Sequence, residues 1–287
     1  MTNSTKGVLL MVLTVLAFAI QDGFSRLLAG NYNTLMVVMI RYWIFGAFVL
    51  ALALRRPEGP RAATRSRHIW THALRAILLV AEICLMVWSY TLIGLINAHA
   101  VFAACPLIVV ALSGPLLGER ISGLRWLAVG LGCAGVILIL QPGGEVFSWP
   151  ALLPLASAFM FALYSVLTRL TTLDEPSFPA LFWPPIIGGV VITVVGLPYL
   201  ESVSARDAVF LIIYGLISVL SNILLQRTYE TVEASVVQPF AYLQIVFVAM
   251  IGVTFFDEAL MPHVVAGVAV VVAAGIFALL LQRRSAP

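Results

Sequence analysis

Four ionisable side chains, Asp22, Arg41, Glu82 and His99, stand inside long apolar stretches of this 287-residue sequence. An ionisable group surrounded by hydrocarbon is energetically costly, so each position is a candidate for gating, charge pairing or proton coupling. The sequence shows no paired metal ligands, no glycine-rich phosphate loop and no nucleophile–base set close together. We therefore predict no catalytic residue, no metal and no cofactor.

Asp22 and Arg41 are placed at a similar depth in their apolar stretches. Counted from the ends of the stretches at 1.5 Å per residue, Asp22 lies about 9 Å deep and Arg41 about 10 Å deep. An ion pair between them is feasible, and it either fixes two helices together or presents a charge to a substrate. Arg26, one turn above Asp22, is a competing partner.

Glu82 lies about 15 Å from the start of its apolar stretch, and no basic residue in the predicted spans matches its depth well. Two interpretations stay open. A buried carboxyl group without a partner favours its neutral form and can serve as a proton site, or it reaches a backbone carbonyl or a water-filled cavity. Glu119 and Glu258 stand at helix ends instead, where a cap or turn contact is the simpler interpretation.

Uncharged polar and aromatic side chains in the apolar stretches supply the candidate binding site. Amide groups facing lipid would leave their donors unpaired, so these helix faces must look inward. Aromatic rings beside them can contact a ring-bearing substrate, while hydrogen bonds between helices are the alternative role for the serines. The predicted substrate contacts are Phe18, Gln21, Trp88, Ser89, Phe161, Tyr164, Asn222, Gln238 and Tyr242.

The composition places these residues in a membrane. Hydrophobic residues make up 62% of the chain and charged residues 10%, and the mean hydropathy is +1.06, whereas soluble domains carry about 25% charged residues. Because a span needs about 20 mostly apolar residues, we predict an all-α membrane protein with ten transmembrane helices. The predicted spans are 7–28, 34–54, 72–93, 96–117, 123–141, 149–169, 179–199, 208–228, 234–256 and 262–282.

Basic residues between the spans predict the orientation. With the N-terminus in the cytoplasm, 13 of the Lys and Arg residues lie on the cytoplasmic side. Only Arg26 and Arg206 then lie on the outer side, with Arg41 inside a span. This bias predicts a multi-pass protein of the bacterial inner membrane with both termini cytoplasmic. The net charge of +3 therefore reflects orientation and not nucleic-acid binding.

The chain contains an internal repeat. Segments 90–119 and 229–258 align without a gap at an offset of 139, and each runs from a tyrosine to a glutamate. Phe18 and Phe161 correspond at an offset of 143. Five spans per half is an odd number, so the second half enters the membrane inverted, and inverted halves create a central site that faces each side in turn. The predicted halves are residues 1–143 and 144–287.

These features resemble the EamA family of the drug/metabolite transporter superfamily. The resemblance rests on Leu117-Gly118-Glu119, Phe256-Asp257-Glu258, Arg41, Pro106 and the Ala-Gly pairs at 134–135 and 274–275. Within the family, the chain is most similar to the YddG-type exporters of aromatic amino acids. One departure is that Ile245 stands where the repeat would place a partner of Pro106, with Pro239 one and a half turns earlier, so the position of a kink in span 234–256 stays open.

The resemblance implies an inner-membrane secondary transporter that exports small amphipathic metabolites, amino acids and aromatic ones among them, by alternating access. Alternatives on the same scaffold are a multidrug or cation carrier, which Glu82 would suit, and a nucleotide-sugar carrier, which needs more basic residues than Arg41. A membrane enzyme finds no support in the motifs, and polar residues in both halves favour a carrier over a channel. The expected partners are a small-molecule substrate and the lipid bilayer, for a monomer or dimer.

Reporter fusions test the predicted orientation. A reporter joined after Arg67 or after Pro287 should report the cytoplasmic side, because the basic loops stay inside. A fusion after Ser202, between two spans on the outer side, is the control and should give the opposite signal. An extracellular signal at Arg67 or Pro287 would overturn the orientation and the helix count.

Overall fold

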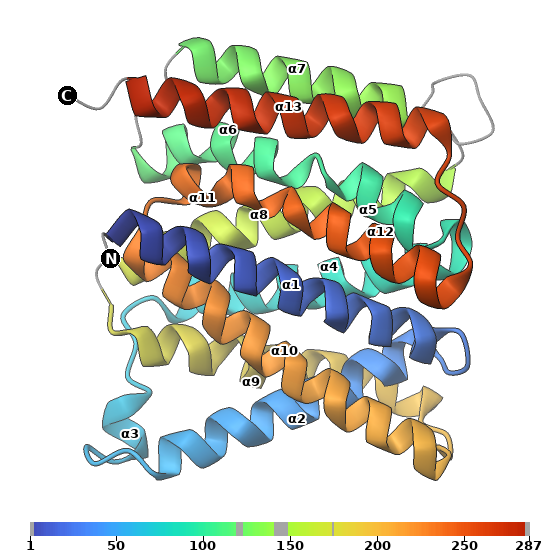
Figure 1. Cartoon of the computed structure of the whole chain (residues 1–287). Coiled ribbons are helices and arrows are strands. Elements are labelled where there is room, and N and C mark those ends of the chain that lie inside the picture. The colour runs from blue at the N-terminus through green and yellow to red at the C-terminus, as the bar shows by residue number, and fades with distance from the viewer. Residues whose placement is uncertain (1–2, 119–122, 141–148, 174, 285–287) are drawn as a thin grey trace.

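The computed structural model describes residues 3–118, 123–140, 149–173 and 175–284. Within these ranges the chain is all-helical and contains no β-strand, as the composition and the spans predicted. Figure 1 shows the long helices lying side by side in one bundle. The start of α1 (Asn3–Ala29) and the end of α13 (Pro262–Arg284) lie at the same end of that bundle.

The other elements follow the predicted spans to within a few residues, apart from one short helix, α3, in the basic loop. Eight segments of the described residues are long and apolar enough to cross a membrane, and Pro262–Ala274 is a shorter apolar helix. The count of ten spans therefore stays a prediction. The elements are α2 (Thr34–Leu54), α3 (Pro60–Ala63), α4 (Ile69–Ile93), α5 (Leu95–Phe102), α6 (Cys105–Leu117), α7 (Gly123–Leu140), η1 (Trp149–Ala151), α8 (Leu152–Thr172), α9 (Ser177–Gly196), η2 (Leu197–Tyr199), α10 (Ala205–Thr231), α11 (Ala234–Ala241) and α12 (Leu243–Phe256).

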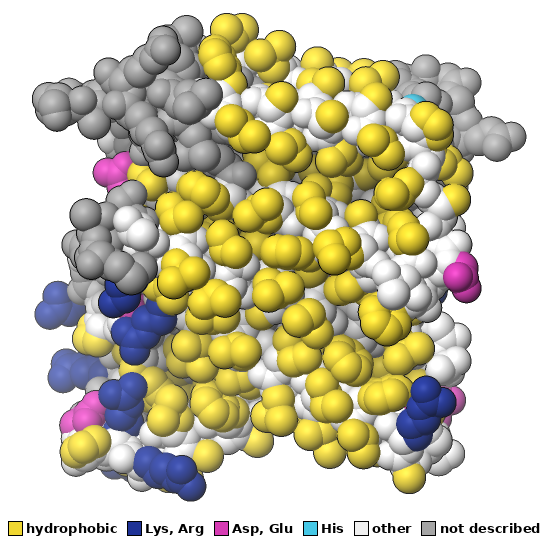
Figure 2. All heavy atoms as spheres, in the orientation of Figure 1, with side chains coloured by type: hydrophobic (Ala, Val, Ile, Leu, Met, Phe, Trp, Pro, Cys, Tyr) yellow, Lys and Arg dark blue, Asp and Glu magenta, His cyan; other side chains and the backbone are white. Residues whose placement is uncertain are grey.

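The outer surface of the bundle is apolar over its middle and charged towards its two ends. Figure 2 shows a broad hydrophobic band, with most of the visible Lys and Arg side chains gathered at the end where α1 begins. Large aliphatic side chains such as Val194 are exposed on this surface, whereas Thr14, Ser218 and Ser221 are fully buried. A lipid environment requires this arrangement, with apolar residues outside and polar residues inside.

Two predicted spans are each broken into two helices, and one of them is span 234–256, in which the sequence left the position of a kink open. Span 96–117 forms α5 and α6 with a break at Ala103, and span 234–256 forms α11 and α12 with a break at Tyr242. Ala103 and Tyr242 are equivalent positions at the offset of 139. Pro106 lies in the first turn of α6, where its missing N–H group costs no helical hydrogen bond, so it favours a helix start there.

Contacts between helices occur in equivalent pairs: a contact between one helix of the first half and one of the second half has a counterpart in which the roles of the halves are swapped. α1 packs along α10, and α4 packs along α8 in the corresponding way. α2 packs on α9, and α7 packs on α13. α6 contacts α8, while α12 contacts α1. This is the pattern that two inverted five-helix halves would produce, so the contacts are compatible with the predicted repeat.

Glu258 caps the first turn of α5. Its carboxylate accepts hydrogen bonds from the backbone N–H groups of Leu95 and Ile96, each at 2.7 Å. Gly94, with φ +81, joins α4 to α5, and a Cβ atom there would lie 3.0 Å from the Glu258 Oε1 atom. The predicted capping role of Glu258 is therefore confirmed. Its repeat equivalent, Glu119, lies outside the described residues.

Replacing Glu258 with Gln should lower the stability of the purified protein by about 1–2 kcal/mol, because an amide NH₂ group would face one of the two backbone donors. The thermal unfolding midpoint in detergent measures this effect. Glu58→Gln, on the exposed basic loop, is the matched control and should leave the midpoint unchanged. Equal midpoints for both variants would contradict the capping role.

Candidate functional site

Two internal cavities lie between the helices, on either side of a shared wall. The first, here called the Arg41 cavity, holds about 480 Å³ of open space. The second, the Gln238 cavity, holds about 530 Å³. The Arg41 cavity is lined by Phe18, Gln21, Asp22, Ser25, Arg41, Leu79, Glu82, Ile83, Met86, Val87, Tyr90, His99, Phe102, Phe161, Tyr214 and Gln244. The Gln238 cavity is lined by Met11, Val15, Phe18, His99, Phe102, Ala103, Cys105, Pro106, Phe161, Ser165, Leu225, Tyr229, Gln238, Ala241, Tyr242, Gln244 and Ile245.

The shared wall consists of Phe18, His99, Phe102, Phe161 and Gln244, which line both cavities. The rings of Phe18 and Phe161 meet edge to face at 5.9 Å and 85°. Phe102 lies 5.8 Å from Phe161 and 5.9 Å from His99, measured between ring centroids. The repeat-equivalent rings of Phe18 and Phe161 thus face each other, as their sequence correspondence predicted. We call these five residues the aromatic wall.

Asp22 pairs with His99 and Gln244, both beside the break in their spans. The Asp22 Oδ2 atom lies 3.0 Å from His99 Nε2 and 3.1 Å from Gln244 Nε2. His99 Nδ1 lies 3.3 Å from the Leu95 carbonyl oxygen, and its ring stacks on Tyr90 at 5.5 Å. Because both imidazole nitrogens face an acceptor, both hydrogen bonds form together only when the imidazole carries two protons.

The predicted ion pair between Asp22 and Arg41 is not formed, so that expectation was wrong. The Arg41 guanidinium instead lies over the rings of Tyr214, at 5.6 Å, and Tyr42, at 5.9 Å. Equal depth in the membrane does not fix the direction in which a side chain points. α1 packs chiefly on α10 and α12, whereas α2 packs on α9 and α10, so the two side chains reach different neighbours.

Glu82 faces the Arg41 cavity and is only 6% exposed. Its backbone carbonyl accepts a hydrogen bond from the Ser157 hydroxyl at 2.8 Å, and the same hydroxyl lies 3.3 Å from its carboxylate. Arg41 lines the same cavity and interacts with Glu82 electrostatically. Depth counting had found no basic residue that matched Glu82 well, yet Arg41 reaches the same cavity from α2.

The Gln238 cavity repeats this arrangement with neutral groups. The Gln238 amide donates to the Tyr229 hydroxyl at 3.2 Å, and Ser165 lies beside the same hydroxyl. Offsets of 139 and 143 relate Tyr229, Gln238 and Ser165 to Tyr90, His99 and Asp22. Each half thus contributes a tyrosine with two polar neighbours, which are ionisable in the first half and neutral in the second.

Of the predicted substrate contacts, five line a cavity and four do not. Phe18, Gln21, Phe161, Gln238 and Tyr242 line one or both cavities. Trp88, Ser89, Tyr164 and Asn222 line neither of these two cavities, so their role as substrate contacts stays a prediction. The face of α4 that meets the Arg41 cavity carries residues 79, 82, 83, 86, 87 and 90, and position 88 points away from the centre of that face. Trp88 is 46% exposed and packs on Trp149 at 6.0 Å instead.

The other three residues make hydrogen bonds within a helix or between two helices. Ser89 donates to the Met86 carbonyl at 2.7 Å. The Tyr164 hydroxyl lies 3.4 Å from the Asn222 amide oxygen, and Asn222 donates to the Ser218 carbonyl at 2.8 Å. Sequence reasoning missed Tyr90, Phe102, Tyr214 and Gln244 as cavity residues. The pairing of Tyr90 with Tyr229 in the repeat was a usable signal for the first of these.

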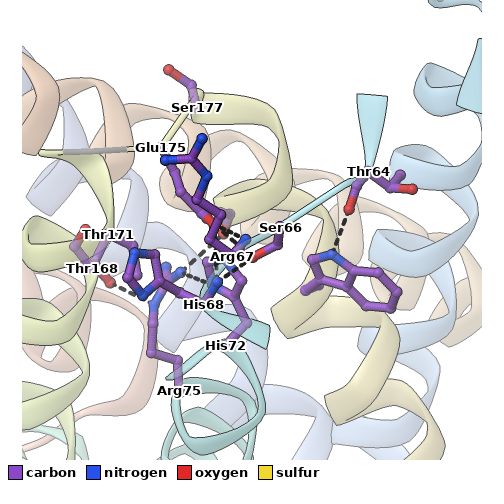
Figure 3. A network of polar contacts seen from close by, with 12 residues as sticks. Thr64, Ser66, Arg67, His68, His72, Arg75, Thr168, Thr171, Glu175 and Ser177 are labelled. Carbon is purple, nitrogen blue, oxygen red and sulfur yellow. Dashed lines mark hydrogen bonds and ion pairs between the residues drawn. The ribbon is translucent and has the colours of Figure 1, made fainter. Parts of the chain in front are cut away.

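A second polar network joins the two halves near the end of the bundle where the chain starts (Figure 3). Glu175, in the loop between α8 and α9, accepts hydrogen bonds from the Ser66 hydroxyl at 2.8 Å and from the backbone N–H groups of Arg67 and His68. Its other oxygen lies 3.0 Å from His72 Nε2. These contacts tie the loop before α4 to the loop before α9. We call them the Glu175 latch.

Arg75 extends the latch into the bundle. It is 1% exposed, and it donates to His72 Nδ1 at 2.9 Å, to the Thr168 hydroxyl at 3.2 Å and to the Ala180 carbonyl at 3.2 Å. Because Nδ1 of His72 accepts from Arg75, its Nε2 atom carries the proton that is donated to Glu175. The sequence had shown two histidines four residues apart without indicating this contact across the halves.

Hydrogen bonds tune the charge of Glu175. Burial acts to raise the pKa of its carboxyl group, but the hydrogen bonds from Ser66, His72 and the backbone of Arg67 and His68 outweigh burial, and the pKa is lowered. Hydrogen bonds that favour the charged form have this effect. The latch therefore holds a carboxylate at neutral pH.

Comparisons with known proteins agree with this architecture. The model of the EamA-like transporter family matches the chain twice, at residues 5–141 and 148–281. A riboflavin transporter of Rhizobium johnstonii is 27% identical over 289 residues, which cover 99% of this chain and 94% of the relative. An S-adenosylmethionine uptake transporter of Rickettsia prowazekii is 23% identical over 279 residues, covering 97% and 94%. A solved crystal structure superposes with a TM-score of 0.75 over 98% of this chain and 99% of its own, at 18% identity, and supports the fold.

A helical bundle with an apolar outer band and polar groups gathered around internal cavities defines a multi-pass membrane transporter. The chain belongs to the EamA-like transporter family of the drug/metabolite transporter superfamily. The relatives above are named for riboflavin and S-adenosylmethionine. The narrower likeness to YddG-type exporters of aromatic amino acids is therefore not supported by these relatives.

Replacing Glu175 with Gln should destabilise the protein by about 1–3 kcal/mol at pH 7, because charged hydrogen bonds are lost. The carboxylate contributes this stability above its ordinary pKa, and the contribution disappears as the pH falls through its lowered pKa. The thermal midpoints of variant and wild type should therefore differ at pH 7 and converge in acid. Glu201→Gln, at an exposed position, is the control. A difference between the midpoints that does not shrink as the pH falls would contradict this account.

Proposed function

We propose that this protein is a secondary transporter that moves a flat, amphipathic metabolite across the bacterial inner membrane, with riboflavin as the first candidate. The observation that carries the proposal is the aromatic wall between two internal cavities. A flat ring can stack on Phe18, Phe102 and Phe161, while its polar part meets Asp22 and Arg41 in the Arg41 cavity. Two relatives that are named for different substrates align with nearly the whole of this chain.

The mechanism that we propose is alternating access between two inverted halves. In two five-span halves, residues 1–143 and 144–287, one cavity would open to each side of the membrane, with the aromatic wall between them. Broken helices beside a central site are typical of such carriers, and the α5–α6 and α11–α12 breaks both lie at the Gln238 cavity. The Glu175 latch, on the side predicted to be cytoplasmic, would open and close with each cycle.

The direction we propose is uptake, because the relative of Rickettsia prowazekii is named an uptake transporter. Export of aromatic amino acids is the second candidate. It is favoured by Arg41 and Glu82, which lie in one cavity and match the opposite charges of a zwitterion. Asp22 and His99 remain candidates for coupling, since they form a buried acid–imidazole pair.

Transport into proteoliposomes tests the proposal. Riboflavin, S-adenosylmethionine and tryptophan are supplied in turn, and we expect saturable riboflavin uptake with counterflow. Phe161→Ala should reduce uptake about 3–10-fold, because an aromatic contact worth about 0.5–1.5 kcal/mol is lost with its buried area. Trp88→Ala is the matched control, since Trp88 is an aromatic residue outside both cavities, and it should transport normally.

Each other outcome has a clear meaning. Saturable transport of tryptophan without riboflavin would favour the second candidate. No saturable transport of any of the three compounds would overturn the proposed substrate class. Equal losses for Phe161→Ala and Trp88→Ala would show that the aromatic wall has no special role.

A further inference from the structure

Arg41 is a buried cation with unused hydrogen-bond donors. Its side chain is 2% exposed, and its Nε and Nη1 atoms have no hydrogen-bond partner among the described residues. The Tyr42 and Tyr214 rings offset part of the cost of burying this charge. A cation–π contact supplies no acceptor atom, so it leaves the Nε and Nη1 donors without a hydrogen bond.

Two hydroxyl groups beside Arg41 also lack a full hydrogen bond. Ser25 Oγ and the Tyr214 hydroxyl are buried and form no hydrogen bond of full geometry within the described part of the chain. Tyr214 makes only weak polar contacts with Ser25 and Arg41. All three residues line the Arg41 cavity. Donors from α1, α2 and α10 that lack a full hydrogen bond therefore gather around one small region of the cavity.

The acidic groups of the same cavity are used elsewhere. Asp22 is bound by His99 and Gln244. Glu82 interacts with Arg41 electrostatically, but the nearest hydrogen-bond donor to its carboxylate is Ser157. Since buried donors are satisfied in nearly all native structures, a cluster of unsatisfied donors needs an explanation. An acceptor that enters the cavity from outside the protein supplies one.

We propose that Ser25, Arg41 and Tyr214 form a subsite for the acceptor edge of the transported molecule, meaning a carboxylate or a pair of ring carbonyl and nitrogen acceptors. A guanidinium group matches such an edge because two parallel N–H groups can bind it together. The aromatic wall lies across the same cavity, so one molecule can stack on Phe18 and Phe161 and present its polar edge to Arg41. This inference deepens the proposed function and rests on it.

Ligand-induced thermal stabilisation of the purified protein tests the subsite directly and needs no transport. The probes are benzoate, which has a carboxylate, benzyl alcohol, which has the ring without it, and riboflavin. Wild-type protein should respond to benzoate and riboflavin more strongly than to benzyl alcohol. Arg41→Gln should weaken the benzoate and riboflavin affinities about tenfold or more, because a charged two-point contact is lost, and should leave the benzyl alcohol response unchanged.

A smaller change separates the subsite from a structural role. Tyr214→Phe removes one hydroxyl group that lines the cavity and should weaken the probes about 2–5-fold. Tyr42→Phe is the matched control: the Tyr42 hydroxyl also lacks a partner, but Tyr42 is not among the residues of the cavity wall. Its affinities should equal those of the wild type.

The outcomes distinguish the possibilities. Loss of the benzoate response alone in Arg41→Gln identifies a carboxylate ligand, and loss of the riboflavin response alone identifies the ring acceptors; both support the subsite. A wild-type protein that responds to neither probe, or an Arg41→Gln variant with unchanged affinities, overturns it. If benzoate binds through Arg41 while no compound is transported in proteoliposomes, the subsite stands and the proposed substrate class falls.

Discussion

In a membrane interior, a buried donor or acceptor cannot form a hydrogen bond to water, and this constraint explains most of the polar contacts in this protein. α5 starts directly after α4 with only Gly94 between them, so its first N–H groups need an internal acceptor, which Glu258 supplies. Asp22 and His99 likewise satisfy each other's hydrogen-bonding groups. Against this background, the unsatisfied donors of Arg41 are among the exceptions, and each exception of this kind needs an explanation.

The repeat gives the two cavities residues at equivalent positions, but the chemistry of those residues differs. Tyr90 has an acid and an imidazole beside it, whereas the equivalent Tyr229 has Ser165 and Gln238. Two halves with identical chemistry would bind a polar group equally well from either side. Because Asp22, Arg41 and Glu82 line only the Arg41 cavity, a molecule that stacked on the aromatic wall as proposed would have a preferred end for its polar group and would be held in one orientation.

Much of the fold could be predicted from the sequence, because lipid imposes a length and composition on every span. The breaks at Ala103 and Tyr242 were not predicted, but they fall on positions that the offset of 139 relates to each other. Side-chain direction was harder to predict. Trp88 has the right depth but lies on the wrong face of α4, and Arg41 has the depth of Asp22 but different helical neighbours. Direction depends on which helices pack together, and hydropathy does not carry that information.

A continuous path of contacts links the Glu175 latch to the aromatic wall. Arg75 of the latch lies over the Tyr164 ring at 5.2 Å, and Tyr164 stacks on Phe161 at 5.8 Å and 29°. Tyr164, predicted as a substrate contact, lies between the two. Packed side chains leave little free volume, so if the latch opens as proposed, a movement of Arg75 would press on Tyr164 and, through it, on Phe161. In the proposed mechanism this contact path would connect the separation of the two halves with the position of the ring that divides the cavities.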